Sequence, residues 1–275
     1  MSPWNRLGRD VIEDGGEFEL PGGPDAALLL HGLTGSTFEV LPVARRLAKD
    51  GLRCLAPVMA GHGGDPAGLV GVPWTEWVAK ARRELSRLEG ARRTFVVGCS
   101  MGALVACALA HDQPARVDGL VLLSPALELT AIGRLGARLA RLPFTRNVIV
   151  PKRGGADVAD LEMRRLNPCM DAMPLAAVAE LVDLERHVDR LLPGIAAPAL
   201  VVHGARDHTV TLAGARRLAR RIGSGPAELV VLPRSWHLVG IDVERDRVAD
   251  EAARFLESLP LPGRRPARSA RSRTR

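Results

Sequence analysis

The sequence feature that most constrains the fold is an alternation of short apolar runs with longer amphipathic stretches along 275 residues. The apolar runs are bounded by glycine, proline or polar residues, which is typical of strands buried on both faces. They lie at residues 26–30, 53–56, 94–97, 119–123, 199–202 and 228–232. Between most of them, Leu, Ala and Arg recur at helical spacing, at residues 43–50, 74–89 and 212–222. This alternation predicts an α/β fold with a mostly parallel sheet, helices on both faces, and ligands at the carboxyl ends of the strands.

One connection is longer than a single crossover helix requires. Residues 124–198 contain two amphipathic patterns, and we predict that they form an inserted helical cap. The core then consists of residues 1–123 and 199–260, which close with a helix at 242–259. In the first pattern Ile132, Leu135, Leu139 and Leu142 share one helical face, opposite Arg134, Arg138 and Arg141. That apolar face either packs on the protein's own core, which we favour, or touches a membrane as a lid.

The net charge of +7 is concentrated at one end of the chain. Six arginines, at positions 264, 265, 268, 271, 273 and 275, face no acidic residue, and without them the chain carries +1. Residues 261–275 contain few apolar side chains, so we predict a disordered tail. We favour a solvated extension over a tether to nucleic acid or to an anionic membrane, and we expect no nucleic-acid partner.

Other global features exclude several classes of protein. No apolar run approaches the roughly 18 residues that a membrane span requires, so we expect no stable membrane anchor. The first residues lack the apolar region of a secretory signal, which predicts a cytoplasmic location. The four cysteines show no CxxC spacing, so we expect reduced thiols, no metal site and no cofactor. The oligomeric state is not predicted.

A candidate nucleophile lies in the run Gly98-Cys99-Ser100-Met101-Gly102. This run fits the G-x-S-x-G pattern and stands directly after a predicted strand and before a helical stretch. In that context Ser100 is expected at a sharp turn above the sheet, and small neighbours let the strand and helix approach.

A base and an orienting acid follow this serine at the ends of later strands. Asp207 comes just after the strand at 199–202, and His237 comes just after the strand at 228–232. Serine is a weak nucleophile at neutral pH, so His237 is expected to accept its proton while Asp207 orients the imidazole. Asp189 and Asp242 lack the strand-end position, and the order Ser, Asp, His is that of α/β-hydrolases.

The oxyanion of such a reaction needs two backbone donors. Met101 offers one at the start of a helix, where the helix dipole also favours negative charge. The turn His31-Gly32-Leu33-Thr34-Gly35, directly after the first predicted strand, can present the N–H of Leu33.

The other histidines and the cysteine beside Ser100 have simpler interpretations. His31 is expected to orient the turn, and His62, His203 and His208 are expected to be structural or solvent-facing. Cys99 is assigned to packing, because this position of the motif points away from the substrate.

The sequence resembles the bacterial carboxylesterases and monoacylglycerol lipases of the α/β-hydrolase superfamily from about Ala26 to Leu259. The matching stretches are LLLHGLTGSTFEV, APVMAGHGGDP, GCSMGALVA, HGARDHTV and the closing run from LPRSWHLVG to FLESL. The resemblance implies triad roles for Ser100, Asp207 and His237, and an apolar acyl-binding cleft under the cap. The sequence departs from the family at Trp236, where glycine usually precedes the histidine. The indole either narrows the alcohol-side pocket or packs against the cap.

These features predict a serine hydrolase without a cofactor. It would cleave a small-molecule substrate, a short- to medium-chain acyl ester or a monoacylglycerol, through an acyl-enzyme. A thioesterase or another acyl hydrolase with the same triad is an alternative. A non-catalytic binding module on a hydrolase fold is a further alternative, which the presence of all three triad residues disfavours.

Overall fold

A computed structural model describes residues 14–145, 147–152 and 154–261. Its centre is a seven-stranded sheet in the order β1-β3-β2-β4-β5-β8-β9, in which all neighbours are parallel except β1 and β3. The strands are β1 (Phe18–Leu20), β2 (Asp25–Leu30), β3 (Arg53–Ala56), β4 (Arg93–Cys99), β5 (Gly119–Leu123), β8 (Ala199–Gly204) and β9 (Glu228–Leu232). The expected mostly parallel sheet is therefore present. The antiparallel edge strand β1 was not predicted from the sequence.

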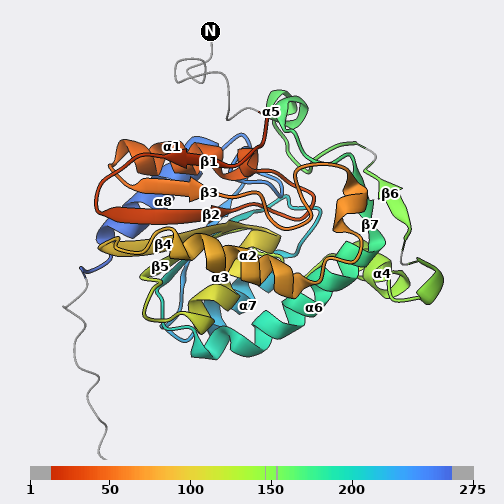
Figure 1. The fold of residues 1–275 in the computed structure, drawn as a ribbon. Coiled ribbons are helices and arrows are strands. Elements are labelled where there is room, and N and C mark those ends of the chain that lie inside the picture. The colour runs from red at the N-terminus through yellow and green to blue at the C-terminus, as the bar shows by residue number, and fades with distance from the viewer. Residues whose placement is uncertain (1–13, 146, 153, 262–275) are drawn as a thin grey trace, which may run out of the picture.

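Helices cover both faces of the sheet (Figure 1). One face carries α1 (Leu41–Lys49) and α8 (Arg245–Ser258), which pack against each other. The other carries α2 (Trp74–Ser86), α3 (Met101–Asp112), α6 (Leu175–Leu191) and α7 (Leu212–Arg221). Successive strand residues point to opposite faces, so the core forms two layers. The α/β fold class predicted from the sequence is confirmed.

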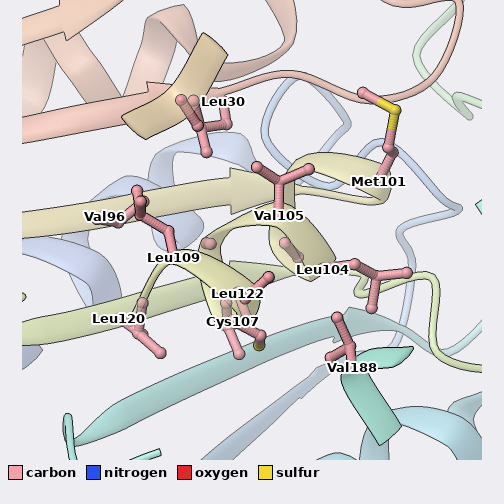
Figure 2. Packing of buried hydrophobic residues seen from close by; sticks show 14 of the residues in the cluster. Leu30, Val96, Met101, Leu104, Val105, Cys107, Leu109, Leu120, Leu122 and Val188 are labelled. Carbon is pink, nitrogen blue, oxygen red and sulfur yellow. The ribbon is translucent and has the colours of Figure 1, made fainter. Parts of the chain in front are cut away.

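The helix that follows Ser100 is the most enclosed α-helix in the described part of the chain. Every residue of α3 from Met101 to Ala110 is buried, because its outer side is covered by α2 and α6 and its inner side lies on the sheet. Figure 2 shows this packing: Val105 and Leu109 of α3 lie near Val96 and Leu30 of the sheet, and Val188 of α6 lies on the other side. A helix that is apolar on all sides is stable only when enclosed in this way.

The segment 124–198 combines helices with a small two-stranded sheet. Its elements are α4 (Ala131–Leu139), η4 (Pro143–Thr145), β6 (Ile149–Pro151), α5 (Leu161–Leu166), β7 (Ala172–Pro174), α6 and η5 (Leu192–Gly194). Strands β6 and β7 pair antiparallel, which the prediction of a helical cap did not include. In Figure 1 α4, β6 and β7 lie at the right, whereas α6 runs along α3 and shares a cluster of buried apolar residues with it. The division into core and cap stays a prediction.

The apolar face of α4 does not pack inward. Ile132 is 85% exposed and Leu135 57%, whereas the small Ala137 is buried. The favoured packing of this face on the protein's own core is therefore wrong: α4 contacts α6, but Ala137 is its only buried residue. Within the described ranges, no helix combines the length and the apolar character needed to cross a membrane. The predicted arginine tail begins at 261 and otherwise lies outside the described residues.

The remaining short elements are η2 (Thr37–Val40) and η3 (Pro66–Leu69). The helix η2 leads from the turn after β2 into α1, and it contacts β2 and β4. It thereby brings its buried residue Glu39 next to the turn that carries Leu33.

Candidate active site

Ser100 lies at a strained turn between β4 and α3. Its φ of 54° is in the region that residues other than glycine rarely adopt, and the chain reverses there within one residue. The turn is held by a hydrogen bond from the Ser100 N–H to the carbonyl oxygen of Leu123, 2.9 Å long. Gly102 allows the helix to approach β2, because a β-carbon there would collide with the carbonyl oxygen of Leu30.

The three side chains predicted as a catalytic triad lie in one hydrogen-bonded chain. His237 Nε2 is 2.9 Å from Ser100 Oγ, and His237 Nδ1 is 2.8 Å from Asp207 Oδ2. The other oxygen of Asp207 accepts the N–H groups of Thr209 and Val210, both at 2.8 Å, which fixes the carboxylate. Ser100 and His237 are buried, with 7% and 5% of their surfaces exposed.

The electrostatics of the site favour a charged imidazole. Burial alone would lower the pKa of His237, but the negative charge and hydrogen bond of Asp207, with smaller contributions from Asp157 and Glu39, raise it above its ordinary value. Burial opposes ionisation of Asp207, yet His237 and the backbone donors lower the pKa of this carboxyl group. The pair is thus arranged to stabilise an imidazolium.

The turn with Leu33 is held from both sides. The N–H of Gly32 donates to Glu39 Oε2 at 2.8 Å, and the N–H of Thr34 donates to His62 Nε2 at 3.1 Å. These bonds use the amides on either side of Leu33 and not its own. Met101 is the first residue of α3, so its N–H is one of the helix donors that have no intrahelical partner. The positions of Leu33 and Met101 agree with the expected oxyanion donors, whose role stays a prediction.

The other histidines hold loops or lie enclosed. His31 is fully buried; its Nε2 accepts the Met59 N–H and its Nδ1 bonds the carbonyl oxygen of Gly32, while burial lowers its pKa to about 3. His62 stacks edge-on against His31, and burial lowers its pKa to about 4. His203 is buried 3.7 Å from Asp207 Oδ2, and burial lowers its pKa to about 4. His31 and His62 therefore act on the turn as neutral groups.

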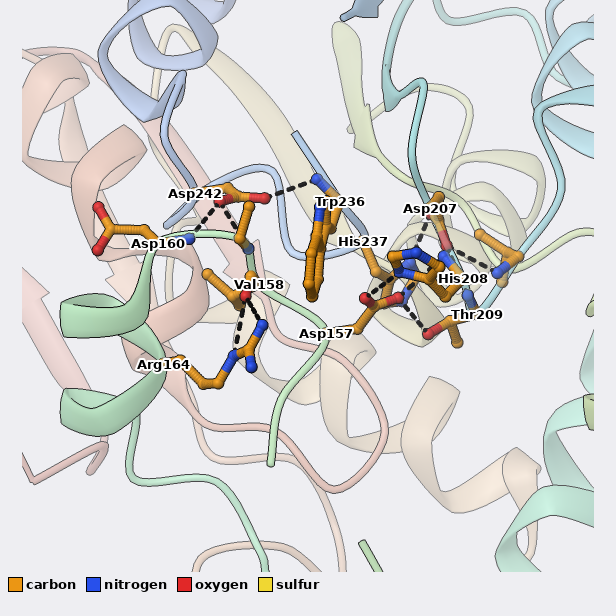
Figure 3. Close-up of polar contacts among 12 residues, drawn as sticks. Asp157, Val158, Asp160, Arg164, Asp207, His208, Thr209, Trp236, His237 and Asp242 are labelled. Atoms are coloured by element: carbon orange, nitrogen blue, oxygen red, sulfur yellow. Dashed lines mark hydrogen bonds and ion pairs between the residues drawn. The ribbon is translucent and has the colours of Figure 1, made fainter. Parts of the chain in front are cut away.

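The two acids set aside in the sequence lie away from His237 Nδ1. Asp189 on α6 pairs with Arg221 of α7 at 2.6 Å. Asp242 is fully buried, and its carboxylate accepts four N–H groups, those of Ala159, Asp160, Trp236 and Val243. Asp242 thus ties the histidine loop to the inserted segment (Figure 3).

Trp236 packs against the inserted segment. The guanidinium of Arg164, on α5, lies 4.9 Å from the centre of the indole ring, and His208 meets the same ring edge-on at 4.7 Å. Of the two interpretations of this residue, packing is the one seen, and Figure 3 shows the indole between these neighbouring loops.

Three residues around the site were missed from the sequence. Glu39 is buried beside Gly32, and burial raises its pKa. Lys152 Nζ donates to Thr34 Oγ1 at 2.9 Å, and Asp157 bonds the loops that carry Asp207 and His237. None has a local signal, because each acts through a tertiary contact; Lys152 and Asp157 come from the inserted segment.

The described part of the chain has no cluster of three or more His, Cys, Asp or Glu side chains that could hold a metal ion. Its four cysteines are free; Cys54, Cys99 and Cys107 are buried, and Cys169 is half-buried. Burial raises the pKa of Cys99 well above the ordinary value, so this thiol beside Ser100 is not activated as a nucleophile.

The parallel sheet with its serine turn between β4 and α3 defines an α/β-hydrolase fold. The chain belongs to the serine aminopeptidase, S33, family, whose model matches residues 24–244. It is therefore a hydrolase.

Similar proteins include several lipolytic enzymes. A thermostable monoacylglycerol lipase from Bacillus sp. (strain H-257) is 27% identical over 246 residues, which is 89% of this chain and 95% of that protein. A carboxylesterase from Bacillus subtilis (strain 168) is 27% identical, over 88% of this chain and 96% of its own. Both relatives span the inserted segment as well as the core.

Solved structures show the same fold. A metagenome-derived lipolytic enzyme superposes with a TM-score of 0.81 at 24% identity, covering 90% of this chain and 99% of its own. A monoglyceride lipase from Saccharomyces cerevisiae superposes with a TM-score of 0.75 at 15% identity, covering 88% of this chain and 90% of its own. At these sequence identities the structural similarity shows a common fold and nothing more.

Proposed function

We propose that this protein is a serine carboxylic ester hydrolase that acts through a covalent acyl-enzyme. The observation that carries the proposal is the hydrogen-bonded chain Ser100–His237–Asp207, at 2.9 and 2.8 Å, at the carboxyl edge of a parallel sheet. This is the arrangement by which a neutral serine becomes a nucleophile in unrelated folds.

In the first half of the reaction Ser100 Oγ attacks the ester carbonyl carbon. His237 Nε2 takes the hydroxyl proton as the Oγ–C bond forms, and the carbonyl π electrons move to its oxygen. The imidazolium then gives that proton to the departing alkoxide as the C–O bond breaks, which leaves an ester on Ser100 and a free alcohol. Asp207 stabilises the imidazolium during this exchange, in line with the raised pKa of His237.

The negative oxygen of the tetrahedral intermediate is assigned to the N–H groups of Leu33 and Met101. Both belong to backbone held in advance, one by the bonds from Gly32 and Thr34 and the other by α3. Each such donor contributes about 3 kcal/mol to stabilising the transition state. In the second half, His237 takes a proton from water, which attacks the acyl carbon, and returns it to Ser100 Oγ as the acid leaves.

The proposed substrates are short- to medium-chain acyl esters or monoacylglycerols. Similarity to a monoacylglycerol lipase and a carboxylesterase, each at 27% identity over most of both chains, supports an oxygen ester as the substrate class. The triad does not distinguish an ester from a thioester, so a thioesterase is an outcome of the test.

A fluorophosphonate probe tests the nucleophile directly. We expect wild type to be labelled on Ser100, Ser100→Ala to remain unlabelled, and the exposed-residue control Ser86→Ala to be labelled like wild type. Ser100→Ala should lower kcat on p-nitrophenyl esters by roughly 10⁶-fold. Absence of labelling in wild type would favour a binding module.

A substrate panel tests the class. Rates with p-nitrophenyl esters of increasing acyl length, with monoacylglycerols and with acyl-CoA should show faster cleavage of short- to medium-chain oxygen esters. Faster cleavage of acyl-CoA would make the protein a thioesterase. Activity only on acetate would exclude a site for longer acyl chains.

A further inference from the structure

Asp157 lies in the inserted segment, at a place where two loops of the core meet it. Its side-chain oxygens accept three donors: His208 Nδ1 at 2.8 Å, the His208 N–H at 3.0 Å and Thr209 Oγ1 at 2.9 Å. These donors belong to the loop that begins with Asp207. Figure 3 shows the carboxylate beside His208 and Thr209, with Asp207 and His237 close behind.

The main chain of the same residue holds the other loop. The carbonyl oxygen of Asp157 accepts the N–H groups of His237 and Leu238, at 3.2 and 3.1 Å. One residue therefore makes five hydrogen bonds, three to the acid loop and two to the histidine loop. A shift of Asp157 would change the distance between Asp207 and His237, which depends on both loops.

We infer that Asp157 is a positioning residue of the triad, which holds the acid loop and the histidine loop in register and adds negative charge behind the imidazole. This inference rests on the proposed function of Ser100, Asp207 and His237. Both relatives described above span this segment, but nothing in those similarities assigns a role to Asp157.

The charge effect is distinct from the mechanical one. The acids that raise the pKa of His237 are Asp207 from the β8 loop, Asp157 from the inserted segment and Glu39 from η2. The buried His203, on β8, lies 3.7 Å from Asp207 Oδ2, and burial keeps it neutral. Asp207 bonds the imidazole ring of His237 directly, whereas Asp157 bonds the main-chain N–H of His237. Neutralising Asp157 should therefore lower the pKa of His237 while its bond to Asp207 persists.

The test compares Asp157→Asn with His208→Gln. Asparagine keeps an oxygen acceptor but loses the charge, whereas His208→Gln keeps the charge of Asp157 and removes the imidazole Nδ1 donor. We expect Asp157→Asn to lower kcat on a p-nitrophenyl ester roughly tenfold to a hundredfold with little change in KM. Its acid limb of kcat/KM should move to lower pH, and that of His208→Gln should not.

The titration of His237 is also measured by NMR in the Ser100→Ala background, which needs no activity. A shift of this titration to lower pH in Asp157→Asn supports the inference, and an unchanged titration together with unchanged kcat overturns it. A purely structural role predicts the same behaviour for Asp157→Asn and His208→Gln, which would also overturn it. Circular dichroism and thermal melting of each variant establish that it is folded, and Asp183→Asn on α6 serves as the surface-acid control.

The two proposals fail in different ways. Wild type that no fluorophosphonate labels contradicts the proposed function. Labelled wild type with an Asp157→Asn variant that matches it in kcat, acid limb and His237 titration contradicts only the role of Asp157.

Discussion

Gly204, the last residue of β8, packs directly against the main chain of Trp236. A β-carbon at position 204 would overlap the carbonyl oxygen of Trp236 and crowd that of Ser235. At Gly204 the strand that leads to Asp207 and the loop that ends at His237 are therefore in direct backbone contact. The hydrogen bond from Arg206 N–H to the Ser235 carbonyl oxygen, 3.2 Å long, continues this contact.

Gly204→Ala is expected to separate these two loops. Overpacking of this kind costs about 1–3 kcal/mol of unfolding free energy, and displacement of His237 should lower kcat at least roughly tenfold. Denaturant unfolding and ester hydrolysis measure the two effects. The control is Gly136→Ala in α4, where a β-carbon meets open space, and the gain in helix propensity should stabilise by up to about 1 kcal/mol. Equal effects of Gly204→Ala and Gly136→Ala on unfolding free energy and kcat would contradict this prediction.

The raised pKa of His237 predicts the pH dependence of hydrolysis. In the proposed mechanism the imidazole must be neutral to accept the proton of Ser100, so kcat/KM is expected to rise with pH through the raised pKa of His237 and then level off. Because Asp207 raises this pKa, the midpoint of the acid limb should lie above 6.5, the ordinary value of histidine. Asp207→Asn should move the limb to lower pH and reduce kcat by roughly 10⁴-fold. A wild-type midpoint below 6.5 would be inconsistent with this electrostatic account.

Asp242 is expected to contribute to the stability of the fold. Its buried carboxylate satisfies four backbone donors in part-buried positions, and Asp242→Ala would leave them without this acceptor. At about 1–3 kcal/mol for each unsatisfied donor, we expect a loss of at least about 3 kcal/mol of unfolding free energy. At a temperature where the variant is folded, the acid limb of its pH profile should stay in place. If Asp242→Ala instead moved the acid limb and left the free energy of unfolding unchanged, Asp242 would act directly on the titration of His237.

The exposed apolar face of α4 favours the alternative hypothesis that this helix touches a membrane. Ile132 and Phe144 are 85% and 79% exposed, and the sequence between Glu128 and Asp157 has six basic and no acidic residues. This combination fits an anionic lipid surface, and like charges disfavour pairing with a second copy of the same face.

Vesicles test that hypothesis. Replacing Ile132 and Phe144 by Ser should weaken binding to vesicles that contain anionic lipid at least roughly tenfold, and leave hydrolysis of a dissolved ester unchanged. Leu161→Ser is the control, because this leucine is 73% exposed on α5, away from α4 in Figure 1. Equal binding of wild type and the double variant would remove the hypothesis.

Much of the core could be predicted because local pattern and tertiary position agree there. The strands at 53–56, 119–123 and 228–232 have the predicted bounds, since flanking glycine, proline and polar residues end each apolar run. The loops after β4, β8 and β9 then bring Ser100, Asp207 and His237 together. The strand β1 has only three residues, and its pairing with β3 leaves no periodic signal.

The inserted segment was less predictable because its helical pattern did not say which surface it would contact. Leucines spaced for a buried face in α4 are exposed, and the short strands β6 and β7 are too brief to show alternation. Asp157 and Glu39 act across 51 and 7 residues of sequence, on His208 and Gly32. Such contacts depend on the finished fold, so no nearby motif marks them.

The enclosure of α3 has a consequence for how this protein loses activity on heating. Ser100 lies between a central strand and a helix whose first ten residues are all buried, so we expect no local opening to release the serine turn while the rest stays folded. Amide exchange in α3 should therefore follow the slowest, global opening of the molecule. Heat inactivation at the serine should coincide with cooperative unfolding of the whole sheet.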